Sequence, residues 1–180
     1  MQIDSKKNNL KNKGNGWVFW ITGLSGAGKT SIANLIKKKI DKRFGPTILI
    51  NGDDIRKIFS FKSYTFNERQ RLAIYYSDFC QEIVKQNINI IFTVVGLFNK
   101  VHKYNKKKIK NYCEIFIKTD VKKIVKFNKK RIYKYKKNIV GIDIKPEFPI
   151  KPNIIITNNF TKNLNDLSNE LYKKIINQIY

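Results

Sequence analysis

The sequence has few of the residues that form covalent or metal-based scaffolds. Its 180 residues include two cysteines, one histidine and four prolines. Two cysteines are too few for a disulfide framework, and neither Cys80 nor Cys113 lies in a CxxC or Cys/His spacing typical of a metal site. Both lie among apolar residues, so we expect buried thiols in a reducing compartment.

Long apolar runs are also absent from the sequence. No run approaches the about 20 residues that span a bilayer, and residues 1–16 lack the apolar segment of a secretory signal. We therefore expect a cytoplasmic protein without membrane association. The length suits one domain, and 42% hydrophobic residues provide for its core. A flexible basic tail is expected over residues 1–16, followed by a single domain over residues 17–180.

Acidic residues are scarce. Thirteen Asp and Glu stand against 37 Lys and Arg, which gives a formal charge of +24. Such a charge is typical of proteins that bind nucleic acid. However, Lys, Ile and Asn together make up 82 of the 180 residues, and these amino acids share A-rich codons, so an AT-rich genome explains the excess more simply. We expect no specific nucleic-acid partner, and the charge would steer anionic small substrates to the protein.

Apolar runs alternate with helical spacings along the chain. Runs typical of buried strands occupy residues 17–22, 47–50, 89–95, 112–117 and 154–157. Helical spacings occupy residues 29–43, 66–86, 121–132 and the segment from 164 onward, where Leu171, Ile175 and Ile179 are expected to contact the core. This alternation predicts an α/β fold in which helices cover both faces of a five-stranded, mostly parallel sheet.

A glycine-rich loop follows the first predicted strand and fits the pattern GxxxxGK[ST]. It consists of Gly23, Leu24, Ser25, Gly26, Ala27, Gly28, Lys29 and Thr30. Its free N–H groups can surround a β-phosphate at a helix N-terminus. Lys29 would reach the β- and γ-phosphates, and the Thr30 hydroxyl would bind Mg²⁺. A chance glycine turn is the alternative, but the position between a buried strand and an amphipathic helix favours an ATP site.

A second polar motif follows the second predicted strand. It reads Asn51-Gly52-Asp53-Asp54-Ile55-Arg56, and in a parallel sheet it would lie at the same edge as the glycine loop. Asp53 could accept a hydroxyl proton or hold Mg²⁺ through water, and Arg56 could pair with an anionic acceptor. Alternatively, Asp53 caps the following helix and Arg56 is a solvated charge. The segment alone leaves both interpretations open.

The two motifs together resemble the adenylylsulfate kinase family, whose pattern is GLSGxGKS/T followed by DGDxxR. The resemblance extends from Trp17 to about Asn158 and includes Glu68-Arg69 and the segment Gly141-Ile142-Asp143. It implies a three-layer P-loop NTPase fold. It also implies an ATP-dependent kinase that phosphorylates the ribose 3′-hydroxyl of a nucleotide, which by default is adenylyl sulfate, as in sulfate assimilation.

The resemblance also implies roles for individual residues. Residues 23–30 would bind ATP, Lys29 and Asp53 would be catalytic, and Thr30 and Asp53 would bind Mg²⁺. Residues implied to bind the acceptor nucleotide are Arg56 and Arg69 at its phosphate end, Tyr64 at its base, and Lys130 in a lid around residues 129–150. A homodimer is left open.

Several positions depart from the family pattern. Asn51 replaces its first Asp, Leu72 and Tyr75 replace an Asn and an Arg, and residues 95–99 (VGLFN) replace the segment ISPxR. The last of these departures belongs to a pattern over residues 96–105, 111–112 and 138–143 that resembles a divergent branch of the family, some of it associated with bacterial surface-polysaccharide synthesis, for which cytidine diphosphoramidate is the alternative acceptor. A third hypothesis is a non-catalytic P-loop protein that binds nucleotide or nucleic acid.

The single histidine, His102, lies in a Lys-rich segment. We interpret it as a surface residue or a hydrogen-bonding support, and not as a general base. The Lys-rich run over residues 106–110 is interpreted as a solvated face.

Overall fold

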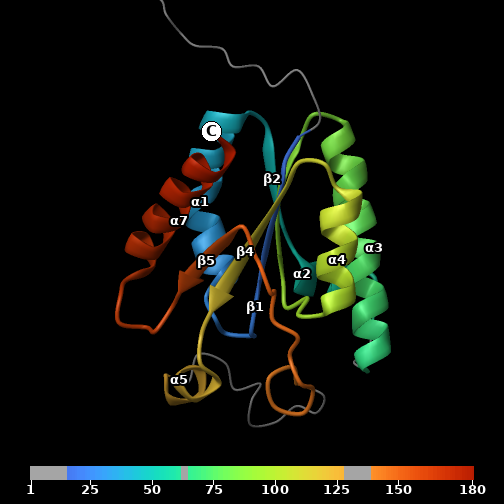
Figure 1. Cartoon of the computed structure of the whole chain (residues 1–180), viewed down its shortest axis with the longest axis vertical. Coiled ribbons are helices and arrows are strands. Elements are labelled where there is room, and N and C mark those ends of the chain that lie inside the picture. Colours follow the sequence, from blue (N-terminus) through green and yellow to red (C-terminus); the bar gives the residue numbers. More distant parts are fainter. Residues whose placement is uncertain (1–15, 62–64, 128–138) are drawn as a thin grey trace, which may run out of the picture.

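The protein is described by a computed structural model over residues 16–61, 65–127 and 139–180. Its described residues form one five-stranded sheet in the order β2-β3-β1-β4-β5, in which all neighbouring strands are parallel (Figure 1). The strands are β1 (Val18–Gly23), β2 (Thr47–Asn51), β3 (Asn89–Val94), β4 (Tyr112–Lys118) and β5 (Ile154–Thr157). The predicted α/β fold with a parallel sheet is confirmed.

Helices cover both faces of the sheet, so the molecule has three layers. The helices are α1 (Lys29–Phe44), α2 (Gly52–Ile58), α3 (Phe66–Lys85), α4 (Asn99–Lys108), α5 (Val121–Lys126) and α7 (Leu164–Ile179). Helices α1 and α7 pack together on one face, and α3 and α4 pack together on the other (Figure 1). In the described part of the chain, no helix is long and apolar enough to cross a membrane.

The central strand β1 shows why the sheet needs helices on both sides. All six of its residues are buried. Because side chains alternate across a strand, Phe19 and Ile21 pack with α1 and α7, whereas Val18 and Trp20 pack with α3 and α4. A strand that is apolar on both faces is stable only between two layers. β1, and with it the loop that follows, is therefore held at the centre of the molecule.

Smaller predictions about the core are also confirmed. Leu171 and Ile175 of α7 are buried, and Ile179 packs against the same core cluster. Cys80 and Cys113 are buried and unpaired. Burial, together with the nearby charge of Glu114, raises the pKa of Cys113 to about 12, which keeps this thiol protonated and unreactive.

Helix α4 was not predicted from the sequence, and α2 was considered only as the helix that Asp53 would cap. α2 begins directly after β2, where the Asn51 side chain accepts a hydrogen bond from the Asp53 backbone N–H at 3.2 Å. α4 lacks a regular apolar spacing because two of its three buried residues, His102 and Asn105, are polar. The helix predicted over residues 121–132 begins as expected at Val121, but most of its second half lies outside the described residues.

Candidate active site

The glycine loop crosses the carboxyl end of the sheet between β1 and α1. Gly26 and Gly28 adopt φ angles of 82° and 95°, a region of backbone conformation that favours glycine. At Gly28, a Cβ atom would also lie only 3.0 Å from the Asn158 Nδ2 atom. Glycine at these two positions therefore allows the tight turn that delivers the chain to the N-terminus of α1.

The loop forms one wall of a cavity of about 570 Å³. This volume is typical of small-molecule sites. The lining residues come from the loop and α1, the β2–α2 junction, the end of β3 and the segments beside β5: Ser25, Gly26, Gly28, Lys29, Thr30, Ser31, Asn51, Asp53, Val94, Val95, Phe127, Asn158, Phe160, Lys162, Asn163 and Leu164. The fold thus brings the glycine loop and the second polar motif into one site.

Lys29 lies against the loop at the edge of this cavity. Its Nζ atom donates hydrogen bonds to the carbonyl oxygens of Gly23 and Leu24, at 2.9 and 2.8 Å. The residue is 9% exposed. These carbonyls hold the ammonium beside the N-terminus of α1, where the helix dipole also attracts anions. A polyphosphate in the cavity would meet both positive groups.

Oxygen ligands suitable for Mg²⁺ lie in the same cavity. Thr30 and Asp53 both line it, and the Thr30 Oγ1 atom is 3.5 Å from the Thr93 Oγ1 atom. Mg²⁺ prefers oxygen ligands and is usually bound by one or two protein groups together with phosphates and water. The donor set therefore fits Mg²⁺ bound to a nucleotide. Among the described residues, no cluster of three or more His, Cys, Asp or Glu could hold a metal by itself.

The structure separates two interpretations of Asp53. The side chain that caps α2 is that of Asn51, and Asp53 belongs to the first turn of the helix. Asp53 is exposed and faces the cavity. The replacement of the first Asp of the family motif by Asn51 thus leaves a functional helix cap, and the Asp53 carboxylate is not needed for that purpose.

The residues predicted to bind the acceptor are not found in this cavity. Arg56 lies on α2, with its Nη1 atom 3.5 Å from the Phe61 carbonyl oxygen, and Arg69 lies in the first part of α3. Neither is among the described residues that line the 570 Å³ cavity. Tyr64 and Lys130 lie outside the described residues. Their roles in acceptor binding remain predictions.

Sequence reasoning missed Asn158, which links β5 to the glycine loop. Its Nδ2 atom donates to the Ala27 carbonyl oxygen at 3.0 Å, and its Oδ1 atom accepts from the Phe160 N–H at 2.9 Å. Asn158 is 2% exposed. A buried amide that satisfies backbone groups in this way orders the loop it contacts. The only available signal was a polar residue directly after a buried strand.

Two aromatic rings complete the cavity. Phe127 and Phe160 pack with their ring centroids 5.1 Å apart, and both line the cavity. Apolar rings are typical walls for the flat part of a ligand. They are distant in sequence, so no local pattern indicated that they would meet.

A second cavity of about 620 Å³ lies at the start of α3 and α4. It is lined by Phe66, Asn99, Asp143, Ile144, Lys145, Pro146, Glu147, Phe148 and Ile150. The short segment over residues 95–99 borders both cavities, since Val95 at its beginning lines the first and Asn99 at its end lines the second.

His102 and Lys106 both contact the buried carboxylate of Glu114 behind this loop. His102 is 5% exposed, and its Nδ1 atom is 2.7 Å from the Glu114 Oε1 atom, so the hydrogen-bonding support is confirmed and the surface position is wrong. The Lys106 Nζ atom lies 3.0 Å from the Glu114 Oε2 atom. Lys106 is nonetheless exposed, like Lys107, Lys108 and Lys110, so the prediction of a solvated face is confirmed for these lysines.

These features define a class of proteins. A parallel sheet with β1 at its centre and a glycine loop that leads directly into α1 is the architecture of P-loop nucleotide-binding proteins. The adenylylsulphate kinase family model matches residues 15–157, and the chain belongs to this family. The curated relatives described below are named as kinases of nucleotides, and this chain is a nucleotide kinase that uses ATP.

Individual relatives differ in the acceptor that their names state. The chain is 30% identical over 168 residues to the cytidine diphosphoramidate kinase of Campylobacter jejuni, covering 91% of this chain and 98% of the relative. It is 27% identical over 149 residues to a probable adenylyl-sulfate kinase of Archaeoglobus fulgidus, covering 78% and 94%. The fold matches that of the Mycobacterium tuberculosis APS kinase CysC in complex with AMPPNP and APS, with a TM-score of 0.80, 18% identity, and coverage of 91% of this chain and 99% of that chain.

Proposed function

We propose that this protein transfers the γ-phosphoryl group of ATP to the ribose 3′-hydroxyl of a nucleotide, and that cytidine diphosphoramidate is the acceptor. The observation that carries the kinase proposal is the single cavity in which Lys29, Thr30 and Asp53 meet. The acceptor is supported by the similarity to a cytidine diphosphoramidate kinase over nearly the whole of both chains. The VGLFN segment over residues 95–99, where the family pattern has ISPxR, points in the same direction.

Each of these residues would have a separate role in phosphoryl transfer. N–H groups of the glycine loop and the N-terminus of α1 would bind the β- and γ-phosphates, and Lys29 would exchange its two carbonyl partners for phosphate oxygens. Mg²⁺ held by Thr30 and Asp53 would neutralise charge on these phosphates. Asp53 would orient the acceptor hydroxyl and accept its proton as the oxygen bonds to the γ-phosphorus and the bond to ADP breaks. Positioning and charge stabilisation provide most of the catalysis in such reactions.

Adenylyl sulfate is the second candidate acceptor, because the family model and several relatives carry its name. The non-catalytic alternative is less well supported, since Lys29, Thr30 and Asp53 all line one cavity in a geometry suited to ATP. A homodimer stays a prediction that light scattering in solution would test.

An ADP-release assay with the two acceptors side by side tests the proposal. We expect ATP consumption that depends on cytidine diphosphoramidate and a product that carries a new phosphomonoester in its ³¹P NMR spectrum. Activity with adenylyl sulfate alone would retain the kinase and change the acceptor. An absence of ATP consumption with both, although ATP binds, would favour the non-catalytic alternative.

A further inference from the structure

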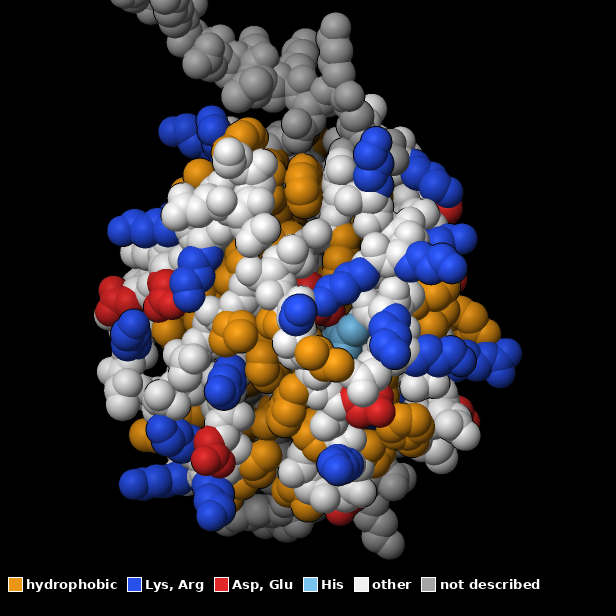
Figure 2. Space-filling view, viewed as in Figure 1, with side chains coloured by type: hydrophobic (Ala, Val, Ile, Leu, Met, Phe, Trp, Pro, Cys, Tyr) orange, Lys and Arg blue, Asp and Glu red, His pale blue; other side chains and the backbone are white. Residues whose placement is uncertain are grey.

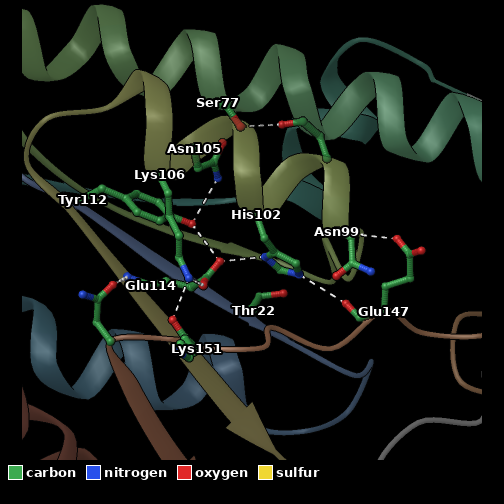
Figure 3. A network of polar contacts seen from close by, with 12 residues as sticks. Thr22, Ser77, Asn99, His102, Asn105, Lys106, Tyr112, Glu114, Glu147 and Lys151 are labelled. Atoms are coloured by element: carbon green, nitrogen blue, oxygen red, sulfur yellow. Dashed lines mark hydrogen bonds and ion pairs between the residues drawn. The ribbon is translucent and has the colours of Figure 1, made fainter.

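A fully buried carboxylate lies at the centre of the network behind the 95–98 loop. Glu114 of β4 is 0% exposed. Its Oε1 atom is 2.7 Å from the His102 Nδ1 atom and accepts from the Tyr112 hydroxyl at 3.2 Å, while its Oε2 atom is 3.0 Å from the Lys106 Nζ atom (Figure 3). Burial acts to raise the pKa of Glu114, but the contacts with His102 and Lys106 outweigh it and lower the pKa. The carboxylate is therefore charged, with its hydrogen-bonding contacts at Oε1 and an ion pair with Lys106 at Oε2.

Both partner residues connect Glu114 to the segment 147–151. The His102 Nε2 atom lies 3.3 Å from the Glu147 carbonyl oxygen, and the Lys106 Nζ atom donates to the Lys151 carbonyl oxygen at 2.6 Å (Figure 3). Each of the two side chains thus contacts the carboxylate on one side and this segment on the other. A buried charge that is paired in this way resists displacement, because moving either partner leaves the charge unsatisfied.

The segment 147–151 in turn holds the loop over residues 95–98. The Glu147 backbone N–H donates to the Leu97 carbonyl oxygen at 3.1 Å, and the Glu147 carboxylate accepts from the Asn99 N–H at 2.7 Å. The other end of the loop has its own anchor, because the Thr22 hydroxyl of β1 donates to the Val95 carbonyl oxygen at 2.5 Å. The end of the loop next to the second cavity therefore depends on Glu114, and the end next to the first cavity does not.

The second cavity is suited to the acceptor nucleotide. A two-substrate kinase needs space for a second nucleotide beside the triphosphate, and 620 Å³ lies within the range of ligand cavities. Phe66 and Phe148 offer aromatic surface for a base, and Lys145 offers a cation for an anionic group.

We propose that Glu114 and His102 are positioning residues for the acceptor: they hold the segment 147–151, which lines the second cavity, and through Glu147 the adjoining loop over residues 95–98. This inference rests on the proposed kinase function. Neither residue lines either cavity, so both act through Glu147 and the loop. Loss of the network should impair use of the acceptor while leaving ATP binding nearly unchanged.

Steady-state kinetics of Glu114→Gln and Lys106→Met test the inference. For each variant we expect the KM for the acceptor to rise roughly tenfold, because displacement of a substrate wall by a fraction of an ångström is costly, while the KM for ATP stays within about twofold. Lys106 is partly exposed, with 40% of its side chain accessible, so its variant should fold even if Glu114→Gln does not. Glu82→Gln, which removes an exposed carboxylate paired with Lys85 on α3, is the matched control and should change neither KM.

The single histidine provides an independent readout. Because the chain has one histidine, its imidazole ¹⁵N signals are assigned without ambiguity. In the wild-type protein, addition of the acceptor nucleotide should shift these signals, and addition of a nonhydrolysable ATP analogue alone should not. A purely structural network would show neither this selectivity nor the separation between the two KM values.

The possible outcomes distinguish the inference from the proposed function. If the wild-type protein is active but the variants raise both KM values equally, or lower only the melting temperature, the positioning role is wrong and the kinase stands. Imidazole signals that do not respond to the acceptor lead to the same conclusion. If the wild-type protein phosphorylates neither acceptor, the proposed function is wrong and the positioning role is lost with it.

Discussion

Replacement of Lys29 by methionine is the most direct test of the candidate active site. The substitution keeps a long unbranched side chain and removes the ammonium that donates to the carbonyl oxygens of Gly23 and Leu24 at 2.9 and 2.8 Å. Lys29 is only 9% exposed, so its charge carries a desolvation cost in the folded protein. Removing the charge removes this cost, which offsets the free energy of the lost hydrogen bonds, and the fold should persist.

The expected effect on function follows from the contacts that the ammonium would make with phosphate. Hydrogen bonds to charged groups contribute about 1.5–3 kcal/mol, which corresponds to a loss of ATP affinity of roughly 10- to 100-fold. Turnover should fall further, by about 100- to 1,000-fold, because charge develops on the transferred group in the transition state.

Calorimetry with a nonhydrolysable ATP analogue and the ADP-release assay measure these two effects separately. Lys38→Met, on the exposed side of the same helix α1, is the matched control and should leave both unchanged. Thermal unfolding of the variant verifies its fold. If Lys29→Met binds ATP and turns over like the wild-type protein, the glycine loop does not bind the triphosphate in the way we propose.

Three further predictions concern other groups. Asp53→Asn should retain ATP binding but reduce turnover by at least about 100-fold, because the change affects the acceptor hydroxyl and the metal ligands only; normal turnover would exclude a catalytic role. The pKa of Glu114 is lowered by folding from a usual value of 4.5, so its carboxylate stabilises the fold above that pH and this contribution is lost as the pH falls through the lower folded pKa. Denaturant unfolding of the wild-type protein and Glu114→Gln should therefore differ at neutral pH and converge in acid, and a difference that does not depend on pH would contradict the paired carboxylate. Burial raises the pKa of Cys80 and raises that of Cys113 to about 12, so iodoacetamide should modify both thiols only as fast as the chain unfolds, whereas rapid modification of the native protein would contradict their burial.

The sheet and the glycine loop were predictable because both depend on short-range rules. Alternation of apolar runs and helical spacings predicted all five strands, the three longest helices α1, α3 and α7, and the beginning of α5. The spacing between Gly23 and Thr30 indicated a phosphate loop, because the pattern itself requires a strand on one side and a helix on the other. For such elements, the residues that determine the local structure lie within a few positions of one another in the sequence.

Helix α4 shows where this reasoning fails. Its buried face includes His102 and Asn105, so its apolar pattern is too weak to predict a helix. These polar residues are buried because Glu114, on the following strand, provides a buried carboxylate and Tyr112 a hydroxyl for them to contact. In Figure 2 the histidine side chain is accordingly seen in a recess between lysine side chains, and not projecting from the surface.

By itself, the sequence determined the class of fold, the position of the phosphate loop and the presence of a second polar motif at the same edge of the sheet. Tertiary structure alone decided that Asn51 and not Asp53 caps α2, that Asn158 supports the glycine loop, and that Glu114 connects α4 to the wall of a second cavity. Strands and phosphate loops follow from interactions between neighbours in the chain. Cavities and buried ion pairs depend on side chains from distant segments, and their contacts exist only once the sheet has brought these segments together.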